Sequence, residues 1–187
     1  AGSDPASMTT RADRVDNGND YVLNGQKMWI STGDQAGVMV VWARTGEAGA
    51  KGISCFLVEE GTHGVSFGKP EEKMGLRASH TVSVSFQDVH IPASNLLGQL
   101  GEGFKIAMTA LDGGRIGIAS QSLGMAQSAI AQTKQYVQER MQFGKALSEF
   151  QSVQFTLANM VTDYDAALML ALRAAWLKEH GKKFTRE

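Results

Sequence analysis

The chain has 187 residues, of which 43% are hydrophobic and 20% charged, with a formal net charge of -1. This composition is that of a globular protein and excludes a disordered or fibrous one, with enough chain for one large or two small domains. The 18 basic and 19 acidic residues are well mixed, so we expect no nucleic-acid partner. Because no apolar stretch reaches membrane-spanning length, we expect no membrane partner either.

The first half of the chain has the pattern of β-strands. In residues 21–30, Asn24-Gly25 lies between two strand-like runs. Both central residues of a type I′ turn need positive φ, so this dipeptide predicts a hairpin. Residues 37–44 are rich in valine and predict a buried strand.

A further strand is predicted at 52–58, around the single cysteine, Cys55, which excludes an internal disulfide and is expected to be a small buried hydrophobic residue. Residues 81–89 alternate polar and apolar side chains, which is typical of a half-buried strand. Short turns such as 60–64 join the strands. Residues 1–99 therefore predict a small antiparallel barrel or sandwich.

The second half of the chain has a helical pattern. Residues from about 103 to 140 contain no proline and carry apolar side chains at helical spacing, which predicts one long helix. A loop is expected through 143–145. A second helix is predicted from about 148 to 180, with Ser148 as N-cap and Gln151 closing a capping box.

Two helices of this length need partners for their apolar faces, either missing helices of the same chain or another subunit. Residues 100–187 are therefore expected to form the first part of an incomplete helical bundle. The fold class that follows is α+β, an antiparallel β-barrel followed by long antiparallel helices.

Six short stretches, taken in chain order, carry a family resemblance. They are Gly2-Ser3-Asp4, 23–31, 102–108, 111–116, Arg140-Met141-Gln142-Phe143-Gly144 and Phe150-Gln151. On these residues the chain resembles the acyl-CoA dehydrogenase family over nearly its whole length, and the short-chain members most closely. In that family a helical N-terminal domain precedes a middle β-barrel and a C-terminal four-helix bundle.

The resemblance implies that this chain is a fragment, with the middle β domain at 1–99 and the first part of the bundle at 100–187. The family's later helices carry a Tyr-Glu-Gly-Thr motif whose glutamate usually removes the substrate's α-proton. Because that motif does not occur here, we assign no catalytic residue to the chain and expect the fragment alone to be inactive.

The resemblance also implies FAD as the cofactor of the parent enzyme, with weak or no binding by this fragment. It assigns to the flavin Trp29, Ile30, Ser31, Arg140, Gln142, Phe143 and Gln151. Trp29 would cover one face of the isoalloxazine, Ser31 would donate to flavin N5, and Arg140 would reach the pyrophosphate of a neighbouring subunit. The alternatives are an ordinary strand aromatic for Trp29, a helix-end cation for Arg140 and the capping role for Gln151.

The residues that the resemblance assigns to the acyl-CoA are Ser3, Phe104, Met108, Asp112, Gly113, Gly114 and Arg115. Two adjacent glycines inside a helix cost roughly 1 kcal/mol each relative to alanine. Either close helix packing or room for a thioester would offset that cost. Asp112 is better interpreted as a pantetheine contact or a structural group than as the base. For Phe104 and Met108 the alternative is ordinary core packing.

By resemblance, the parent protein oxidises a short-chain acyl-CoA to the trans-2-enoyl-CoA and passes electrons to an electron-transfer flavoprotein, as a homotetramer. The alternatives are an acyl-CoA oxidase, a flavin monooxygenase of the same fold, or a non-catalytic oligomerising fragment. We expect a cytoplasmic location if the source is bacterial, which is favoured, and the mitochondrial matrix if it is eukaryotic. The four histidines are scattered without ligand spacing, so no metal site is expected.

Overall fold

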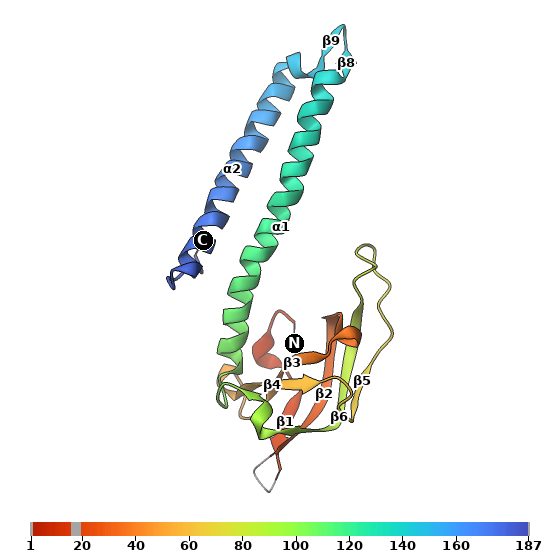
Figure 1. Cartoon of the computed structure of the whole chain (residues 1–187), viewed down its shortest axis with the longest axis vertical. Helices are drawn as coiled ribbons and strands as arrows, with labels where there is room; N and C mark the ends of the chain where they lie inside the picture. Colours follow the sequence, from red (N-terminus) through yellow and green to blue (C-terminus); the bar gives the residue numbers. More distant parts are fainter. Residues whose placement is uncertain (1, 16–19, 187) are drawn as a thin grey trace. The chain divides into compact units, whose positions relative to one another are not determined.

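The computed structural model describes residues 2–15 and 20–186. They divide into two compact units, Ala1–Met108 and Thr109–Glu187, each described here by itself (Figure 1). The division falls inside helix α1, Gly103–Glu139, whose first six residues belong to the first unit. The domain boundary proposed at 99/100 stays a prediction.

The first unit contains a seven-stranded sheet in the order β5-β6-β2-β1-β3-β4-β7. The strands are β1 Arg11–Arg14, β2 Asp20–Ser31, β3 Val38–Arg44, β4 Ile53–Glu59, β5 Val65–Phe67, β6 Thr81–Pro92 and β7 Leu96–Leu97. Short 3-10 helices lie at Pro5–Ser7 (η1), Gly33–Gln35 (η2), Ala50–Gly52 (η3) and Ala93–Asn95 (η4). All strand pairs are antiparallel except β1 with β3, which are joined in parallel at Arg11 and Arg44.

The α+β class is confirmed, but the sheet described here is open and does not close into the predicted barrel. The two outermost strands, β5 and β7, are three and two residues long. Strands this short offer too few backbone N–H and C=O groups to hydrogen-bond the two edges of the sheet to each other.

The core of the first unit is made by alternate residues of β2, β3, β4 and β6. Its fully buried members include Leu23, Phe56, Val82, Val89 and Ile91. Cys55 is also fully buried, and burial raises the pKa of its thiol to about 11. The prediction of a small buried hydrophobic residue at this position is confirmed.

The predicted hairpin at Asn24-Gly25 is wrong, because β2 passes through this dipeptide without a turn. A bulge opposite β6 lies between Leu23 and Gly25. Gly25 has a φ of 136°, and a Cβ there would lie 2.8 Å from the Cα of Thr10. The glycine therefore serves a close approach of two backbones rather than a type I′ turn.

The second unit is built mainly from two long helices, as predicted. Within it α1 and α2, Gln151–Glu179, lie side by side and run in opposite directions (Figure 1). Between them are the two-residue strands β8, Met141–Gln142, and β9, Lys145–Ala146, and the 3-10 helix η5, Leu147–Glu149.

The predicted capping of the second helix is wrong. Phe150 is the N-cap residue, and no side chain caps it. The local acceptor is instead the carboxylate of Glu149, which takes a hydrogen bond of 3.0 Å from the backbone N–H of Ala146.

Both long helices expose large apolar side chains within the second unit. Examples are Ile118 and Met125 on α1 and Phe155 and Met169 on α2, each at least 60% exposed. Exposure of this extent is expected of helices that belong to a larger bundle. Of the helices described, none is both long enough and apolar enough to cross a membrane.

Candidate functional site

The end of β2 carries a second irregularity, at Trp29. Lys27 pairs with Val84 and Ile30 with Val82, so two residues of β2 lie opposite one residue of β6. Trp29 has a φ of 62°, a left-handed conformation that costs a residue of this kind roughly 1–2 kcal/mol. Its side chain is 66% exposed rather than packed in the core. Strain that presents a large aromatic to solvent supports a binding role for Trp29.

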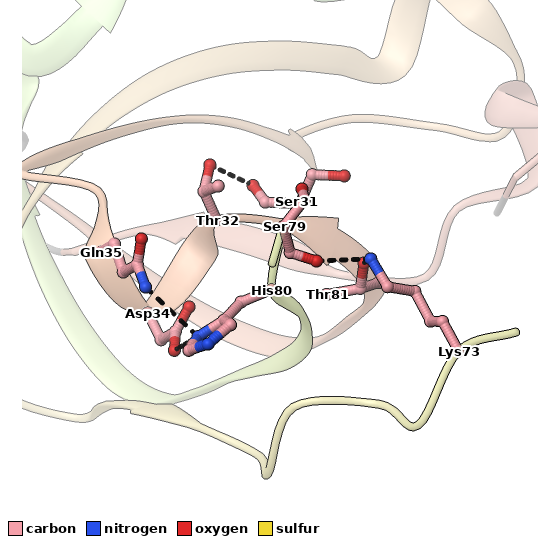
Figure 2. Close-up of polar contacts among 8 residues, drawn as sticks. All are labelled: Ser31, Thr32, Asp34, Gln35, Lys73, Ser79, His80 and Thr81. Atoms are coloured by element: carbon pink, nitrogen blue, oxygen red, sulfur yellow. Dashed lines mark hydrogen bonds and ion pairs between the residues drawn. The ribbon is translucent and has the colours of Figure 1, made fainter. Parts of the chain in front are cut away.

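Ser31 follows two residues later, as the last residue of β2, and is exposed. The next residue, Thr32, is again left-handed, with a φ of 54°. Its N–H donates to the carbonyl of His80 at 2.8 Å. Its hydroxyl donates to the carbonyl of Ser31, also at 2.8 Å (Figure 2). These bonds fix the backbone direction immediately after Ser31.

A cluster of polar side chains holds the turn that follows Ser31 (Figure 2). The Nδ1 atom of His80 lies 2.7 Å from Oδ2 of Asp34 and 3.3 Å from Nε2 of Gln35. Lys73 donates to the hydroxyl of Thr81 at 3.0 Å and to the carbonyl of Ser79. The cluster joins η2 to the start of β6, so it positions the end of β2. The sequence assigned no role to His80.

An apolar cleft of about 430 Å³ lies on one face of the first unit. This size is within the range of small-molecule sites. Three of the predicted site residues, Ile30, Ser31 and Phe104, line it. The indole N–H of Trp42 donates to the carbonyl of Gly103 at 2.8 Å and so fixes the first turn of α1 beside the cleft.

Lys27 is an unexpected member of this cleft. Its ammonium group donates to the carbonyl of Trp42 at 2.7 Å and lies 3.9 Å from the sulfur of Met8. Burial lowers the pKa of Lys27 to about 8, because an apolar surrounding disfavours the charged form. Sequence reasoning missed this residue, since a lysine in a strand is ordinarily solvated.

Three other predicted residues of the first unit, Ser3, Trp29 and Met108, lie outside the lining of this cleft. Ser3 is exposed, although its neighbour Gly2 contributes to the cleft wall. Met108 is half-buried on α1, one turn beyond Phe104. The cleft therefore gathers part of the predicted flavin set and one residue of the predicted substrate set.

In the second unit, Asp112 and Arg115 form an ion pair of 2.6 Å across one turn of α1. The hydroxyl of Thr185 donates to the same carboxylate at 3.3 Å. All three line a small cavity of about 280 Å³ between the two helices. Asp112 thus has an ion-pair partner and a hydrogen-bond donor within the second unit, and its role stays a prediction.

The two adjacent glycines have different surroundings. A Cβ at Gly113 would lie 2.7 Å from Nζ of Lys178, which is the far end of a flexible side chain. A Cβ at Gly114 would meet no atom within 4 Å. Within the described residues, backbone packing therefore explains neither Gly113 nor Gly114.

The remaining predicted flavin residues lie in the loop between the helices and at the start of α2. Arg140, Gln142 and Gln151 are exposed. Phe143 is 93% exposed with a φ of 52°, and its ring meets that of Phe150 edge to face at 6.3 Å. The loop therefore presents an aromatic ring, a guanidinium and two amides to solvent at one end of the unit.

Among residues 2–15 and 20–186, no three His, Cys, Asp or Glu side chains gather as metal ligands.

Comparison with known proteins agrees with this description. The family model of the acyl-CoA dehydrogenase middle domain matches residues 1–89, and that of the acyl-CoA dehydrogenase C-terminal domain matches residues 101–187. The chain is 47% identical over 186 residues to a short-chain specific acyl-CoA dehydrogenase of Megasphaera elsdenii, covering 99% of this chain and 48% of that protein.

Two solved structures are similar over nearly the whole chain. Butyryl-CoA dehydrogenase from Megasphaera elsdenii has a TM-score of 0.92 at 47% identity, covering 99% of this chain and 48% of the other. A structure described as "PigA with FAD and proline" has a TM-score of 0.93 at 30% identity, with 98% and 48% covered.

The two family models thus match a middle domain in the β part of the chain and a C-terminal domain in its helical part. The chain belongs to the acyl-CoA dehydrogenase family. It spans about half the length of the curated relatives it matches.

Proposed function

We propose that the whole protein is an FAD-dependent acyl-CoA dehydrogenase that oxidises a short-chain acyl-CoA to the trans-2-enoyl-CoA. The observation that carries this proposal is the strained, 66% exposed Trp29 on a bulged strand, two residues before an exposed Ser31 and next in sequence to Ile30, which lines an apolar cleft. The name of the Megasphaera elsdenii relative supports the short-chain substrate. The FAD of the PigA structure supports the cofactor.

In this proposal FAD supplies the acceptor for the hydride that leaves the β-carbon. Trp29 covers one face of the isoalloxazine and excludes water, with Ile30 beneath it in the cleft wall. Ser31 donates its hydroxyl to the flavin. The turn cluster around His80 and Asp34 holds Ser31 in place.

The loop of the second unit is proposed to bind the pyrophosphate of FAD in a neighbouring subunit of a homotetramer. Arg140 provides a guanidinium, whose fork geometry matches phosphate oxygens. Gln142, Phe143 and Gln151 complete the lining. The exposure of all four side chains leaves them available for this contact.

The acyl-CoA is proposed to lie along the start of α1. Phe104 and Met108 would form apolar walls, and Asp112 and Arg115 polar contacts along the thioester and pantetheine. Gly113 and Gly114 would leave room for the thioester, and Ser3 would contact the CoA portion. The base that removes the α-proton is proposed to lie outside these 187 residues, so this chain alone is expected to be inactive and to hold FAD weakly or not at all.

The proposed electron acceptor is an electron-transfer flavoprotein. A bacterial source would place the enzyme in the cytoplasm, which we favour, and a eukaryotic source in the mitochondrial matrix. The competing functions on the same fold, acyl-CoA oxidase and flavin monooxygenase, differ in that oxygen takes the electrons directly.

The test is an anaerobic titration of the whole protein with butyryl-CoA, in which the absorbance of the flavin band at about 450 nm is followed. We expect bleaching with butyryl-CoA and reoxidation by an electron-transfer flavoprotein. A flavin that stays oxidised with every acyl-CoA would contradict the proposal. Rapid peroxide formation in air would instead identify an oxidase.

A matched pair of variants tests the role of Trp29 in the same protein. Trp29→Phe keeps an aromatic ring at the bulge and should retain FAD. Trp29→Ala removes the ring and should weaken FAD retention during gel filtration at least tenfold more than the phenylalanine variant, since a stacked aromatic contributes about 1–3 kcal/mol. Equal retention of FAD by both variants would show that Trp29 does not contact the flavin.

A further inference from the structure

The amine of Lys27 is placed unusually for a lysine side chain. It lies in the wall of the apolar cleft, where its one oxygen acceptor among the described residues is the carbonyl of Trp42, at 2.7 Å. Within residues 2–15 and 20–186, no carboxylate forms an ion pair with it. The structure thus holds an amine at a fixed position with no neighbouring negative charge to keep it protonated.

The chemical consequence is a neutral, nucleophilic amine near physiological pH. Burial lowers the pKa of Lys27 to about 8. At about pH 7.5 roughly a quarter of such an amine is neutral, against about a thousandth of an ordinary exposed lysine. A neutral amine that donates one hydrogen to the Trp42 carbonyl keeps its lone pair free for attack.

We propose that Lys27 is a site of covalent acylation by acyl-CoA thioesters that enter this cleft. Its Nζ attacks the thioester carbonyl, an amide C–N bond forms, and the C–S bond breaks. The amine loses one proton and CoA leaves as the thiol, so atoms and electrons balance without an oxidant or reductant. The acylated nitrogen keeps one N–H, which can still donate to Trp42.

The cleft has the shape and chemistry to hold the acyl group. Ile30, Val40 and Phe104 are apolar members of its lining, and its volume of about 430 Å³ exceeds what a short acyl chain needs. Only the class of reagent, an acyl-CoA, rests on the proposed function. The acylation itself requires no flavin and no catalytic base from outside the chain.

The experiment uses the 187-residue chain incubated with butyryl-CoA and analysed by peptide mass mapping over time. Lys134, an exposed lysine on α1, is the internal control. We expect Lys27 to gain a butyryl group about tenfold faster than Lys134 at near-neutral pH. The rate at Lys27 should level off above pH 8, where its amine is already largely neutral.

Two further measurements test whether the fast labelling of Lys27 depends on the folded cleft. In concentrated urea the two lysines should react at similar rates, because the burial of Lys27 is lost. Lys27→Arg, checked for folding by circular dichroism, should lose the fast label and no other.

Equal rates at Lys27 and Lys134 in the folded chain, or a rate at Lys27 that keeps rising above pH 9, would overturn the inference. Dehydrogenase turnover by the whole protein is measured separately, so that failure of the acylation can be told apart from failure of the proposed function. Labelling without turnover contradicts only the dehydrogenase, and turnover without labelling contradicts only the acylation of Lys27.

Discussion

Asn24 and Asp88 are joined across β2 and β6 by two hydrogen bonds that use the whole amide of Asn24. Its Nδ2 donates to the carboxylate of Asp88 at 3.0 Å, and its Oδ1 accepts from the backbone N–H of Asp88 at 2.8 Å. Asp88 itself is left-handed, with a φ of 48°. The pair therefore connects two irregular backbone positions, the bulge beside Gly25 and a strained residue of β6.

We expect Asn24→Ala to destabilise the first unit by about 1–2 kcal/mol, because two hydrogen bonds are lost at once. Asp88→Asn is the matched control. Asparagine tolerates the left-handed region and keeps both the backbone donor and a side-chain oxygen, so it should change stability by less than about 0.5 kcal/mol. Urea unfolding followed by tryptophan fluorescence measures both, and equal effects would contradict the pairing.

Arg44 joins the segment after Ser3 to the loop after β3. Its guanidinium donates to the carbonyls of Ala6 and Glu47, both at 2.6 Å, and to that of Met8 at 3.1 Å. A lysine cannot reproduce this fork. Arg44→Lys should therefore cost about 1–3 kcal/mol of unfolding free energy.

The control for Arg44 is the neighbouring Arg11, whose exposed side chain pairs with Asp13 at 2.9 Å. Exposed pairs contribute little, so Arg11→Lys should leave the unfolding midpoint unchanged. Limited proteolysis supplies a second readout. Arg44→Lys should speed cleavage within residues 2–10, and a variant with wild-type proteolysis would show that Arg44 does not hold this segment.

Much of the fold was predictable from local pattern. The strands at 37–44 and 81–89 and both long helices follow from the spacing of apolar residues, which reports burial directly. The Asn24-Gly25 hairpin was wrong because the same dipeptide suits a bulge as well as a turn. The predicted closure of the sheet into a barrel was also wrong, since strands as short as β7, with two residues, leave no periodic signal in the sequence.

The candidate site was predictable only where a motif carried it. Ile30 and Ser31, which motif resemblance assigned to the flavin, and Phe104, which it assigned to the acyl-CoA, line one cleft, and their ligands stay predictions. Lys27 and Arg44 were missed because their environments depend on residues far along the chain, such as the carbonyls of Trp42 and Ala6. No local periodicity reports such long-range partners.

Burial of Cys55 predicts a defined loss of stability at alkaline pH. The thiol's pKa is raised from 9.0 to about 11 in the folded chain, so the folded state holds its proton longer than the unfolded state. The contribution of this thiol to the free energy of unfolding is fully present below pH 9 and is lost as pH rises to 11. The expected loss is about 2–3 kcal/mol.

Comparison of the wild type with Cys55→Ala isolates this effect of Cys55. Lys27, whose pKa is lowered to about 8, acts in the opposite direction, adding stability as pH rises from 8 toward 10.5. That contribution is common to both proteins and cancels in the difference. Urea unfolding from pH 7 to 11 should show the difference shrinking above pH 9, and a constant difference would contradict the raised thiol pKa.

Substitution of Gly114 in α1 is predicted to raise stability but to weaken substrate binding, and Gly113 serves as its comparison. Gly114→Ala should stabilise the helix by about 1 kcal/mol, because alanine is the better helix former and its Cβ meets no atom within 4 Å. Gly113→Ala should gain less, since its Cβ would displace the amine of Lys178. Thermal unfolding of the 187-residue chain measures both.

In the whole protein, the stabilising Gly114→Ala should raise the KM for butyryl-CoA about tenfold if the open space beside Gly114 receives the thioester. The substitution adds one methyl group to the wall of a site that needs close contact with the ligand. Steady-state kinetics over a range of acyl-CoA concentrations measure the change, with FAD content as the control for an intact flavin site. An unchanged KM together with the expected gain in stability would show that Gly114 does not border the substrate.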